Sequence, residues 1–211
     1  MTPDDIAAFD VDGTLTKRDC VLPFLVRVGG RARVAGVLAR RAGLLAAARR
    51  DRARRDDVKA ALSAAVLAGR PAGDVAEIGE RFAGEIADRW IRDDVAARLA
   101  WHRDAGHEVV LVTASFALYA EPLGRRLGAS RVMATELEVD RSGRLTGRLA
   151  GANCRGQEKV RRLAALYGDP PPLGWAYGDS PDDEPMLAQA RHPVSIGPTA
   201  LVAVPSSMGD A

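Results

Sequence analysis

Cysteine and histidine are scarce in this sequence, and neither forms a pattern. Its 211 residues include two cysteines, Cys20 and Cys154, with no CxxC pair, and three histidines that do not cluster. These counts argue against a disulfide framework and a zinc site. The first five residues lack the features of a signal peptide, and apolar runs such as residues 44–48 are too short to span a bilayer. We therefore expect a cytoplasmic protein.

An excess of one charge is also missing from the chain as a whole. The formal net charge is +2, with 47% apolar and 27% charged residues, which is typical of a globular protein and does not indicate nucleic-acid binding. The charge is unevenly distributed, because residues 27–59 hold 11 basic and 3 acidic residues, a local +8. The length suits one core domain with a modest insertion.

Two kinds of segment divide the chain. Residues 16–93 are rich in alanine, arginine and leucine, which favours helices. Those helices are expected over residues 21–28, 32–50, 56–67 and 72–90. Beyond them, strands (108–112, 131–134, 175–177, 193–196) alternate with helices (94–105, 116–127, 156–167, 184–190) around a hairpin at 136–149. We predict an α/β fold, a Rossmann-like parallel sheet core from residues 1–15 and 94–211 with residues 16–93 as an inserted helical cap.

Two aspartates stand one residue apart after the first predicted strand. Residues 6–9 are apolar, and Asp10-Val11-Asp12-Gly13-Thr14 follows at once. Since strand side chains alternate, Asp10 and Asp12 would point to one side, and Gly13 would let the backbone turn sharply. Two carboxylates this close need a cation, a proton or a strong donor nearby. The alternative without a function is an acidic turn at a strand end.

Other polar residues follow later strands or begin a helix. Thr113 comes directly after the strand at 108–112, and Asp179 comes two residues after the strand at 175–177. Because ligands of parallel sheets bind beyond the carboxyl ends of the strands, these residues should meet Asp10 there. Lys159 lies in the first turn of a predicted helix, where the helix dipole disfavours a lysine, so a functional role is favoured.

These four motifs, in this order, resemble those of the haloacid dehalogenase-like superfamily. The resemblance extends from residue 6 to about residue 197 and is greatest to the branch of phosphoserine phosphatase and the bacterial phosphatidylglycerophosphate phosphatases. It implies a Mg²⁺-dependent phosphomonoester phosphatase that works through an aspartyl-phosphate. A cap between the first and second strands is also what this branch implies.

The resemblance assigns a role to each motif. Asp10 would be the nucleophile and Asp12 the general acid and base, with Thr113 and Lys159 as further catalytic residues. The metal ligands would be the Asp10 and Asp179 carboxylates and the Asp12 carbonyl, with Asp183 supporting the waters of the Mg²⁺. The expected substrate contacts are Gly13, Thr14, Asp19, Arg54, Arg55, Ala114, Ser115 and Arg155.

Two departures from phosphoserine phosphatases bear on the substrate. Asp19 stands where those enzymes carry a longer glutamate, and Arg155 occupies the position of their lysine. Asp19 is either a substrate contact or the N-cap of the helix at 21. With Arg54, Arg55 and the local +8, these residues favour a substrate more anionic than phosphoserine, such as a phospholipid headgroup phosphate.

Several alternatives stay open at this point. The basic segment is either a solvated face of the cap or a peripheral contact to anionic lipid. The enzyme is either a phosphatase, for a small phosphorylated metabolite such as phosphoserine or for a lipid, or a phosphotransferase. A non-catalytic phosphate-binding module is the remaining hypothesis. The sequence predicts no oligomeric state.

Overall fold

The computed structural model describes residues 5–43 and 54–201, except for the side chain of Arg55. Within these ranges the chain forms a five-stranded sheet in the order β3-β2-β1-β6-β7, with all neighbouring strands parallel. The strands are β1 (Ile6–Phe9), β2 (Glu108–Phe116), β3 (Arg131–Thr135), β6 (Leu173–Gly178) and β7 (Ala190–Ser195). The predicted α/β fold with a Rossmann-like parallel sheet is confirmed.

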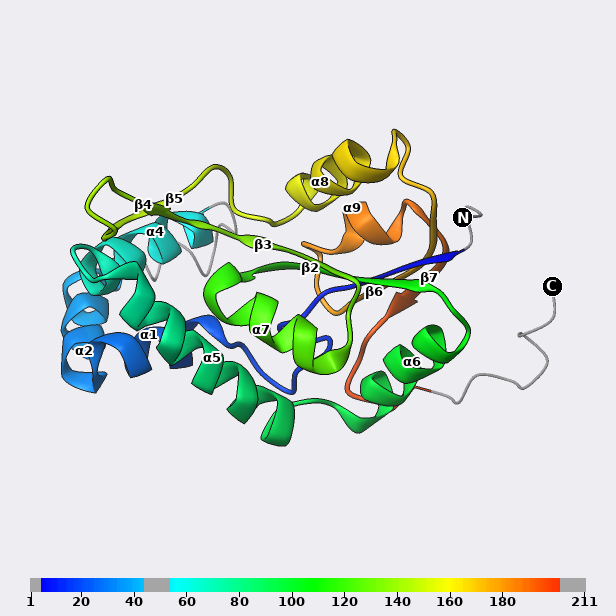
Figure 1. The fold of residues 1–211 in the computed structure, drawn as a ribbon, viewed down its shortest axis with the longest axis horizontal. Helices are drawn as coiled ribbons and strands as arrows, with labels where there is room; N and C mark the ends of the chain where they lie inside the picture. Colours follow the sequence, from blue (N-terminus) through cyan, green and yellow to red (C-terminus); the bar gives the residue numbers. More distant parts are fainter. Residues whose placement is uncertain (1–4, 44–53, 202–211) are drawn as a thin grey trace.

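Helices cover both faces of this sheet (Figure 1). One face carries α6 (Asp93–Asp104) and α7 (Ala117–Leu127), and the other carries α8 (Gln157–Tyr167) and α9 (Glu184–Leu187). The central strand β1 serves both layers, because its side chains alternate. Ala7 and Phe9 join the apolar cluster that includes α6 and α7, whereas Ile6 and Ala8 join the one that includes α8 and α9. This burial on both faces explains why residues 6–9 are uniformly apolar.

The segment between β1 and β2 is helical in its described parts. It forms α1 (Val21–Gly29), α2 (Arg31–Arg40), α4 (Arg54–Leu67) and α5 (Ala72–Arg89), which extend to the left of the sheet in Figure 1. A single helix over residues 32–50 was predicted, and this is wrong, because α2 ends at Arg40. The N–H of Arg41 is shared between the Val37 and Leu38 carbonyls, a geometry common at helix ends. Residues 44–50 lie outside the described ranges.

Two crossings join this cap to the core, and they run side by side. Thr16 and Ile91 form an isolated antiparallel bridge. The Lys17 N–H donates to the Trp90 carbonyl at 2.8 Å, and the Arg92 N–H donates to the Leu15 carbonyl at 2.9 Å. The cap therefore leaves and re-enters the core at one place.

Helix α5 fixes the cap against α7 of the core. Gly79 allows this close approach, because a Cβ there would lie 2.1 Å from the Leu118 carbonyl oxygen. Around this point, Phe82 meets Tyr119 edge to face with ring centroids 5.3 Å apart, and Phe24 lies 4.8 Å from Tyr119. These rings are buried, so the contact is an apolar seam between cap and core.

The predicted hairpin forms and lies against the cap. Strands β4 (Leu137–Val139) and β5 (Leu145–Leu149) are antiparallel and sit beside α4 (Figure 1). The Gly69 N–H donates to the Leu145 carbonyl at 2.8 Å, and the Ala72 N–H donates to the Gly143 carbonyl at 2.9 Å. A piece of the chain that the sequence assigned to the core thus supports α4 from the side.

Candidate active site

A cavity of about 440 Å³ opens where the carboxyl ends of β1, β2 and β6 meet under α4. It brings together residues at or after the ends of these strands, residues of α1 and α4 in the cap, and residues of the last motif. Its described lining is Asp10, Asp12, Gly13, Asp19, Val21, Leu22, Asp56, Val58, Lys59, Leu62, Thr113, Ala114, Asn153, Arg155, Lys159, Asp179, Ser180, Asp182 and Asp183. The predicted catalytic and metal-binding residues all lie in this list.

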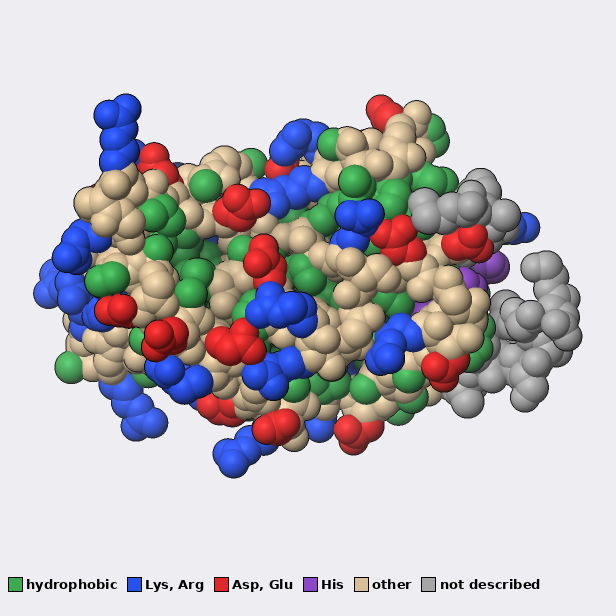
Figure 2. Space-filling model, in the orientation of Figure 1, with side chains coloured by type: hydrophobic (Ala, Val, Ile, Leu, Met, Phe, Trp, Pro, Cys, Tyr) green, Lys and Arg blue, Asp and Glu red, His purple; other side chains and the backbone are tan. Residues whose placement is uncertain are grey.

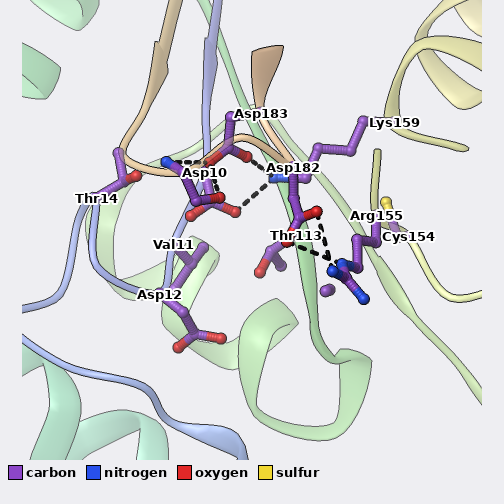
Figure 3. A network of polar contacts seen from close by, with 12 residues as sticks. Asp10, Val11, Asp12, Thr14, Thr113, Cys154, Arg155, Lys159, Asp182 and Asp183 are labelled. Carbon is purple, nitrogen blue, oxygen red and sulfur yellow. Dashed lines mark hydrogen bonds and ion pairs between the residues drawn. The ribbon is translucent and has the colours of Figure 1, made fainter. Parts of the chain in front are cut away.

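Lys159 joins two of the carboxylates at the floor of the cavity. Its ammonium donates to Asp10 Oδ1 and to Asp183 Oδ1, each at 2.6 Å (Figure 3). Only 2% of the lysine side chain is exposed. Burial opposes its charge, but the two carboxylates outweigh that cost and raise the pKa of Lys159. The lysine is therefore a fixed cation beside Asp10.

Three carboxylates at this point could hold a divalent cation. Ligand oxygens of Asp10, Asp179 and Asp183 all lie within 4.8 Å of one another. Burial raises the pKa of Asp10 to about 7 against the opposing effect of Lys159, and it also raises the pKa of Asp179. The single ammonium of Lys159 thus does not balance the negative charge of the three carboxylates. Hard oxygen donors of this kind fit Mg²⁺, so the residues present suit the metal that the family resemblance implies.

The turn after Asp12 lies directly against Asp179. Gly13 has a φ of +86°, and a Cβ there would lie 2.3 Å from Asp179 Oδ2, so only glycine fits. Thr14 was expected to contact substrate, but it is fully buried and donates to Asp179 Oδ1 at 3.1 Å. The turn folds Thr14 beneath the aspartate, where its hydroxyl holds the Asp179 carboxylate in place.

The last motif holds Asp183 from the other side. The N–H and the hydroxyl of Ser180 donate to Asp183 Oδ2 at 3.0 and 2.8 Å. Together with Lys159 they occupy both oxygens of a side chain that is 1% exposed. Asp183 is therefore held in one position beneath the cavity.

Strand β2 is irregular where the second motif lies. The strand continues to Phe116, so Thr113 stands within it and not after its end as predicted. Its register with β3 passes from Val112↔Met133 directly to Phe116↔Thr135. The two extra residues make a bulge, a feature that often redirects side chains at active sites. Thr113 and Ala114 consequently line the cavity.

Ser115 takes a different position from the one expected. Its side chain is fully buried and lies outside the described cavity lining. Its hydroxyl donates to Asp12 Oδ2 at 2.5 Å, and the Cys20 N–H donates to Asp12 Oδ1 at 2.9 Å. Burial and the nearby Asp19 raise the pKa of Asp12 to about 6, while these two hydrogen bonds oppose the rise. Ser115 therefore acts on Asp12 and not on the substrate.

Asp19 lies at the start of α1, where Cys20 and not Asp19 is the N-cap residue, and its contact with a substrate stays a prediction. It lines the cavity, and its Oδ1 accepts the Leu22 N–H at 3.2 Å at the start of α1.

Lys59 of α4 is the cation among the described cavity residues that sequence reasoning missed, and the polar residues missed with it are Asp56, Asn153, Ser180 and Asp182. It is 9% exposed and donates to the Ala114 carbonyl and, at 2.7 Å, to Asn153 Oδ1. Burial lowers the pKa of Lys59 to about 8, against the opposing charges of Asp12 and Asp56. A signal was present in the sequence, because Lys59 shares the buried stripe of α4 with Leu62 and Val66 at helical spacing.

The expected arginine contacts are only partly placed in the cavity. Arg155 lines it, but its guanidinium is paired with Asp182 at 2.9 Å and with Asp56 of α4 at 3.3 Å (Figure 3 shows the Asp182 side). Arg54 is exposed at the start of α4 and is not among the described lining residues. The side chain of Arg55 lies outside the described part of the structure. Arg155 thus links the core to the cap.

The family is shown by a match that covers most of the chain. A family model for haloacid dehalogenase-like hydrolases matches residues 7–188. The chain belongs to this family of hydrolases, and it is an enzyme. The hypothesis of a non-catalytic phosphate-binding module therefore does not hold.

Individual relatives and solved structures resemble this chain over most of its length. Protein CicA from Caulobacter vibrioides is 38% identical over 185 residues, which are 88% of this chain and 82% of that one. A protein of unknown function from Bordetella pertussis Tohama I has a similar structure, with a TM-score of 0.73 and 25% identity over 90% of this chain and 88% of that one. A phosphoserine phosphatase solved as a phospho-aspartyl intermediate analogue has a TM-score of 0.59 and 20% identity over 89% and 83% of the two chains, a likeness of fold.

Proposed function

We propose that the protein is a Mg²⁺-dependent phosphomonoester phosphatase that works through a phosphorylated Asp10. The observation that carries this proposal is the contact of Asp10 with Lys159 in a cavity that also contains Asp12 and Asp179. A buried carboxylate held by a lysine can attack phosphorus, and the second acid can serve the leaving group. The phospho-aspartyl state of the structurally similar phosphoserine phosphatase supports the same chemistry here.

Each residue has one task in this proposal. Asp10 attacks the phosphorus atom, and Asp12 gives a proton to the leaving oxygen and later takes one from the attacking water. Lys159 and Thr113 bind the phosphoryl oxygens and stabilise their charge. Asp10, Asp179 and the Asp12 carbonyl would hold Mg²⁺, with Asp183 supporting its waters. When bound, the cation neutralises charge on the phosphoryl group.

Substitution of the two acids tests the chemistry. Asp10→Asn should abolish phosphate release with little change in fold, because the amide has nearly the same shape. Asp12→Asn should lower turnover of an alkyl phosphate by roughly 10²- to 10⁴-fold, the usual contribution of general acid–base help. Asp104→Asn, an exposed position on α6, is the matched control. Substantial turnover by the Asp10→Asn protein would rule out the covalent mechanism.

Removal of the metal tests the acidic cluster. EDTA should stop turnover, and Mg²⁺ should restore it. Ca²⁺ should inhibit, because its larger and looser ligand shell does not impose the same geometry. Binding of Mg²⁺ by calorimetry should weaken strongly in the Asp179→Asn protein. Full turnover in thoroughly chelated buffer would contradict the proposal.

The residues on the cap side of the cavity support a proposal about the class of substrate. Lys59 offers a cation, and Val21, Leu22, Val58 and Leu62 offer an apolar wall. We propose a phosphomonoester whose leaving group carries a second anionic group and a hydrocarbon part. Phosphoserine and a glycerophosphate lipid headgroup both meet this description.

A substrate screen distinguishes these two kinds of substrate. Phosphoserine, phosphatidylglycerophosphate in micelles, glycerol 3-phosphate and phosphoethanolamine differ in the second anion and in the apolar part. The first two should have the higher kcat/KM, and Lys59→Met should raise their KM more than it lowers kcat. Phosphate release without an added alcohol distinguishes hydrolysis from phosphotransfer. Equal rates for all four would remove the role given to Lys59.

Contact with a lipid surface is a separate proposal about the cap. Arg31, Arg33, Arg40 and Arg41 are exposed, and Lys and Arg side chains gather at the cap end of the molecule in Figure 2. In the described ranges, no helix is both long enough and apolar enough to cross a bilayer. The proposed contact is peripheral and electrostatic, worth about 1 kcal/mol per basic residue near the surface. Co-sedimentation with anionic liposomes should occur at low salt and disappear at high salt, and its absence at low salt would contradict the contact.

The site of action proposed for the enzyme is the cytoplasm. The support is the state of Cys20 and Cys154, which are both buried free thiols.

A further inference from the structure

The buried hydroxyl groups of Ser115 and Tyr119 form a chain of hydrogen bonds that ends at the Asp12 carboxylate. Ser115 Oγ lies 2.5 Å from Asp12 Oδ2, and Tyr119 OH lies 2.7 Å from the same Ser115 oxygen. Ser115 and Tyr119 are each 0% exposed, and neither is among the described residues that line the cavity. The proposed mechanism assigns no task to either hydroxyl.

The direction of these hydrogen bonds is fixed in the carboxylate form of Asp12, which is the form that remains once its proton has left. An ionised carboxylate only accepts, so the single hydrogen of Ser115 points to Asp12. Ser115 must then accept from Tyr119, and the chain runs from Tyr119 through Ser115 to Asp12. The other carboxylate oxygen accepts the Cys20 N–H at 2.9 Å. Asp12 is thus held at both oxygens from behind.

The packing around Tyr119 fixes where this chain begins. Its ring lies against Phe24, with ring centroids 4.8 Å apart, and meets Phe82 and Phe116 edge to face at 5.3 and 6.4 Å. The phenol therefore cannot turn away without disturbing the apolar seam between cap and core. A donor that is already in place needs no rearrangement when charge develops on its acceptor.

We propose that Ser115 and Tyr119 are positioning residues that stabilise the carboxylate form of Asp12 during proton transfer. This inference rests on the proposed phosphatase function. As the bond from phosphorus to the leaving oxygen breaks, the Asp12 proton moves to that oxygen, and its electron pair stays on the carboxylate. The hydrogen bonds from Ser115 and Cys20 then become charge-assisted, which strengthens them at that moment.

The consequence is a dependence on the leaving group. An alkyl phosphate expels a strongly basic alkoxide and needs the proton of Asp12. An aryl phosphate such as p-nitrophenyl phosphate expels a weakly basic anion and needs the proton far less. Loss of the hydroxyl chain should therefore affect the first class of substrate much more than the second.

The experiment compares kcat/KM of Ser115→Ala and Tyr119→Phe on glycerol 2-phosphate and p-nitrophenyl phosphate. Ser115→Ala should lower the alkyl value by about 10-fold or more and the aryl value by less than about 3-fold. Tyr119→Phe should have the same selectivity with a smaller loss. In an Asp12→Asn background, Ser115→Ala should add almost nothing, because the group that it serves is gone.

The control and the opposing results are equally specific. Tyr167→Phe removes a phenol whose hydroxyl donates to Glu108 at 2.7 Å, at the start of β2, and should leave both values unchanged. Equal losses on both substrates, or a full further loss in the Asp12→Asn background, would overturn the positioning role and leave the phosphatase intact. A wild-type protein that hydrolyses neither of these esters nor any of the four substrates of the screen would overturn the proposed function itself.

Discussion

Among single residues, Lys59 has a charge that changes in the working pH range. Burial lowers its pKa to about 8 from an ordinary value of 10.5. Below pH 8 the group is an ammonium, and above pH 8 it becomes neutral. If the ammonium binds an anion on the leaving group, KM for such a substrate should rise as the pH passes 8. The measurement is KM from pH 6.5 to 9.5.

Two variants and one substrate make this test specific. Lys59→Arg keeps its charge over the whole range and should remove the rise, whereas Lys59→Met should have a high KM at every pH. A phosphate without a second anion, such as phosphoethanolamine, should show no such rise with the wild-type protein. A rise that persists in the Lys59→Met protein would have to come from another group.

The predictability of the site also differs from residue to residue. Asp10, Asp12 and Gly13 lie within four residues of one another directly after β1 and line one cavity, so the local sequence predicts that they are close; β1 ends at Phe9, so strand alternation is not the reason. Lys59 comes close to them only because α4 crosses over the end of the sheet, and that packing is not encoded locally. Ser115 was correctly singled out but given the wrong partner, because the bulge in β2 decides which way its side chain points.

At the scale of elements, the seam between α5 and α7 predicts opposite effects of two similar substitutions. A Cβ on Gly79 would lie 2.1 Å from the Leu118 carbonyl oxygen, whereas a Cβ on Gly84 would make an ordinary contact with Arg126 at 3.7 Å. Gly79→Ala should therefore destabilise the fold by about 1–3 kcal/mol. Gly84→Ala should stabilise it by about 0.5–1 kcal/mol, because glycine weakens a helix interior.

Urea unfolding of the two variants checks this pair. Both substitutions add one methyl group to the same helix, so a difference between them reports the contact and not helix propensity. Equal midpoints for the two variants would mean that α5 does not approach α7 this closely.

Element boundaries were predictable where a chemical signal marks them. Helix α7 ends at Leu127, directly before Gly128, whose left-handed conformation (φ +71°) suits glycine, and the sequence indicated this stop. The end of α2 at Arg40 carries no such signal, since Arg41 follows and no glycine or proline stands there. The extension of β2 to Phe116 was likewise hidden, because it depends on pairing with Thr135 of β3.

For the molecule as a whole, a buried histidine links stability to pH. His102 is 0% exposed, and its ring nitrogens lie 2.8 Å from Tyr177 OH and 2.7 Å from His107 Nδ1. Burial lowers the pKa of His102 to about 3. In the unfolded chain, His102 binds a proton below its ordinary pKa of 6.5, whereas in the folded protein it stays neutral down to about pH 3. The stability is therefore complete above pH 6.5 and is lost as the pH falls from 6.5 towards 3.

The shifted pKa of His102 should lower the free energy of unfolding by about 2 kcal/mol between pH 7.5 and pH 5. Burial of Asp10 acts in the opposite direction, because its pKa is raised, so the histidine effect is measured as a difference. The gap in unfolding free energy between the wild type and His102→Gln should shrink by this amount at pH 5. A gap that is independent of pH would mean that His102 is protonated in the fold.

Because of the paired crossings at Thr16 and Ile91, the cap as a whole can be replaced by another insert. Because the chain leaves and re-enters the core at hydrogen-bonded neighbours, a helical insert of another length can be exchanged there without moving β1 or α6. Evolution can thus vary the choice of substrate while the acids of the sheet stay constant. A foreign cap would have to bring its own apolar face for Tyr119, since Phe24 and Phe82 leave with the native one. It would also have to supply the backbone N–H that Cys20 gives to Asp12, so successful chimeras should keep residues 16–20 of the native chain.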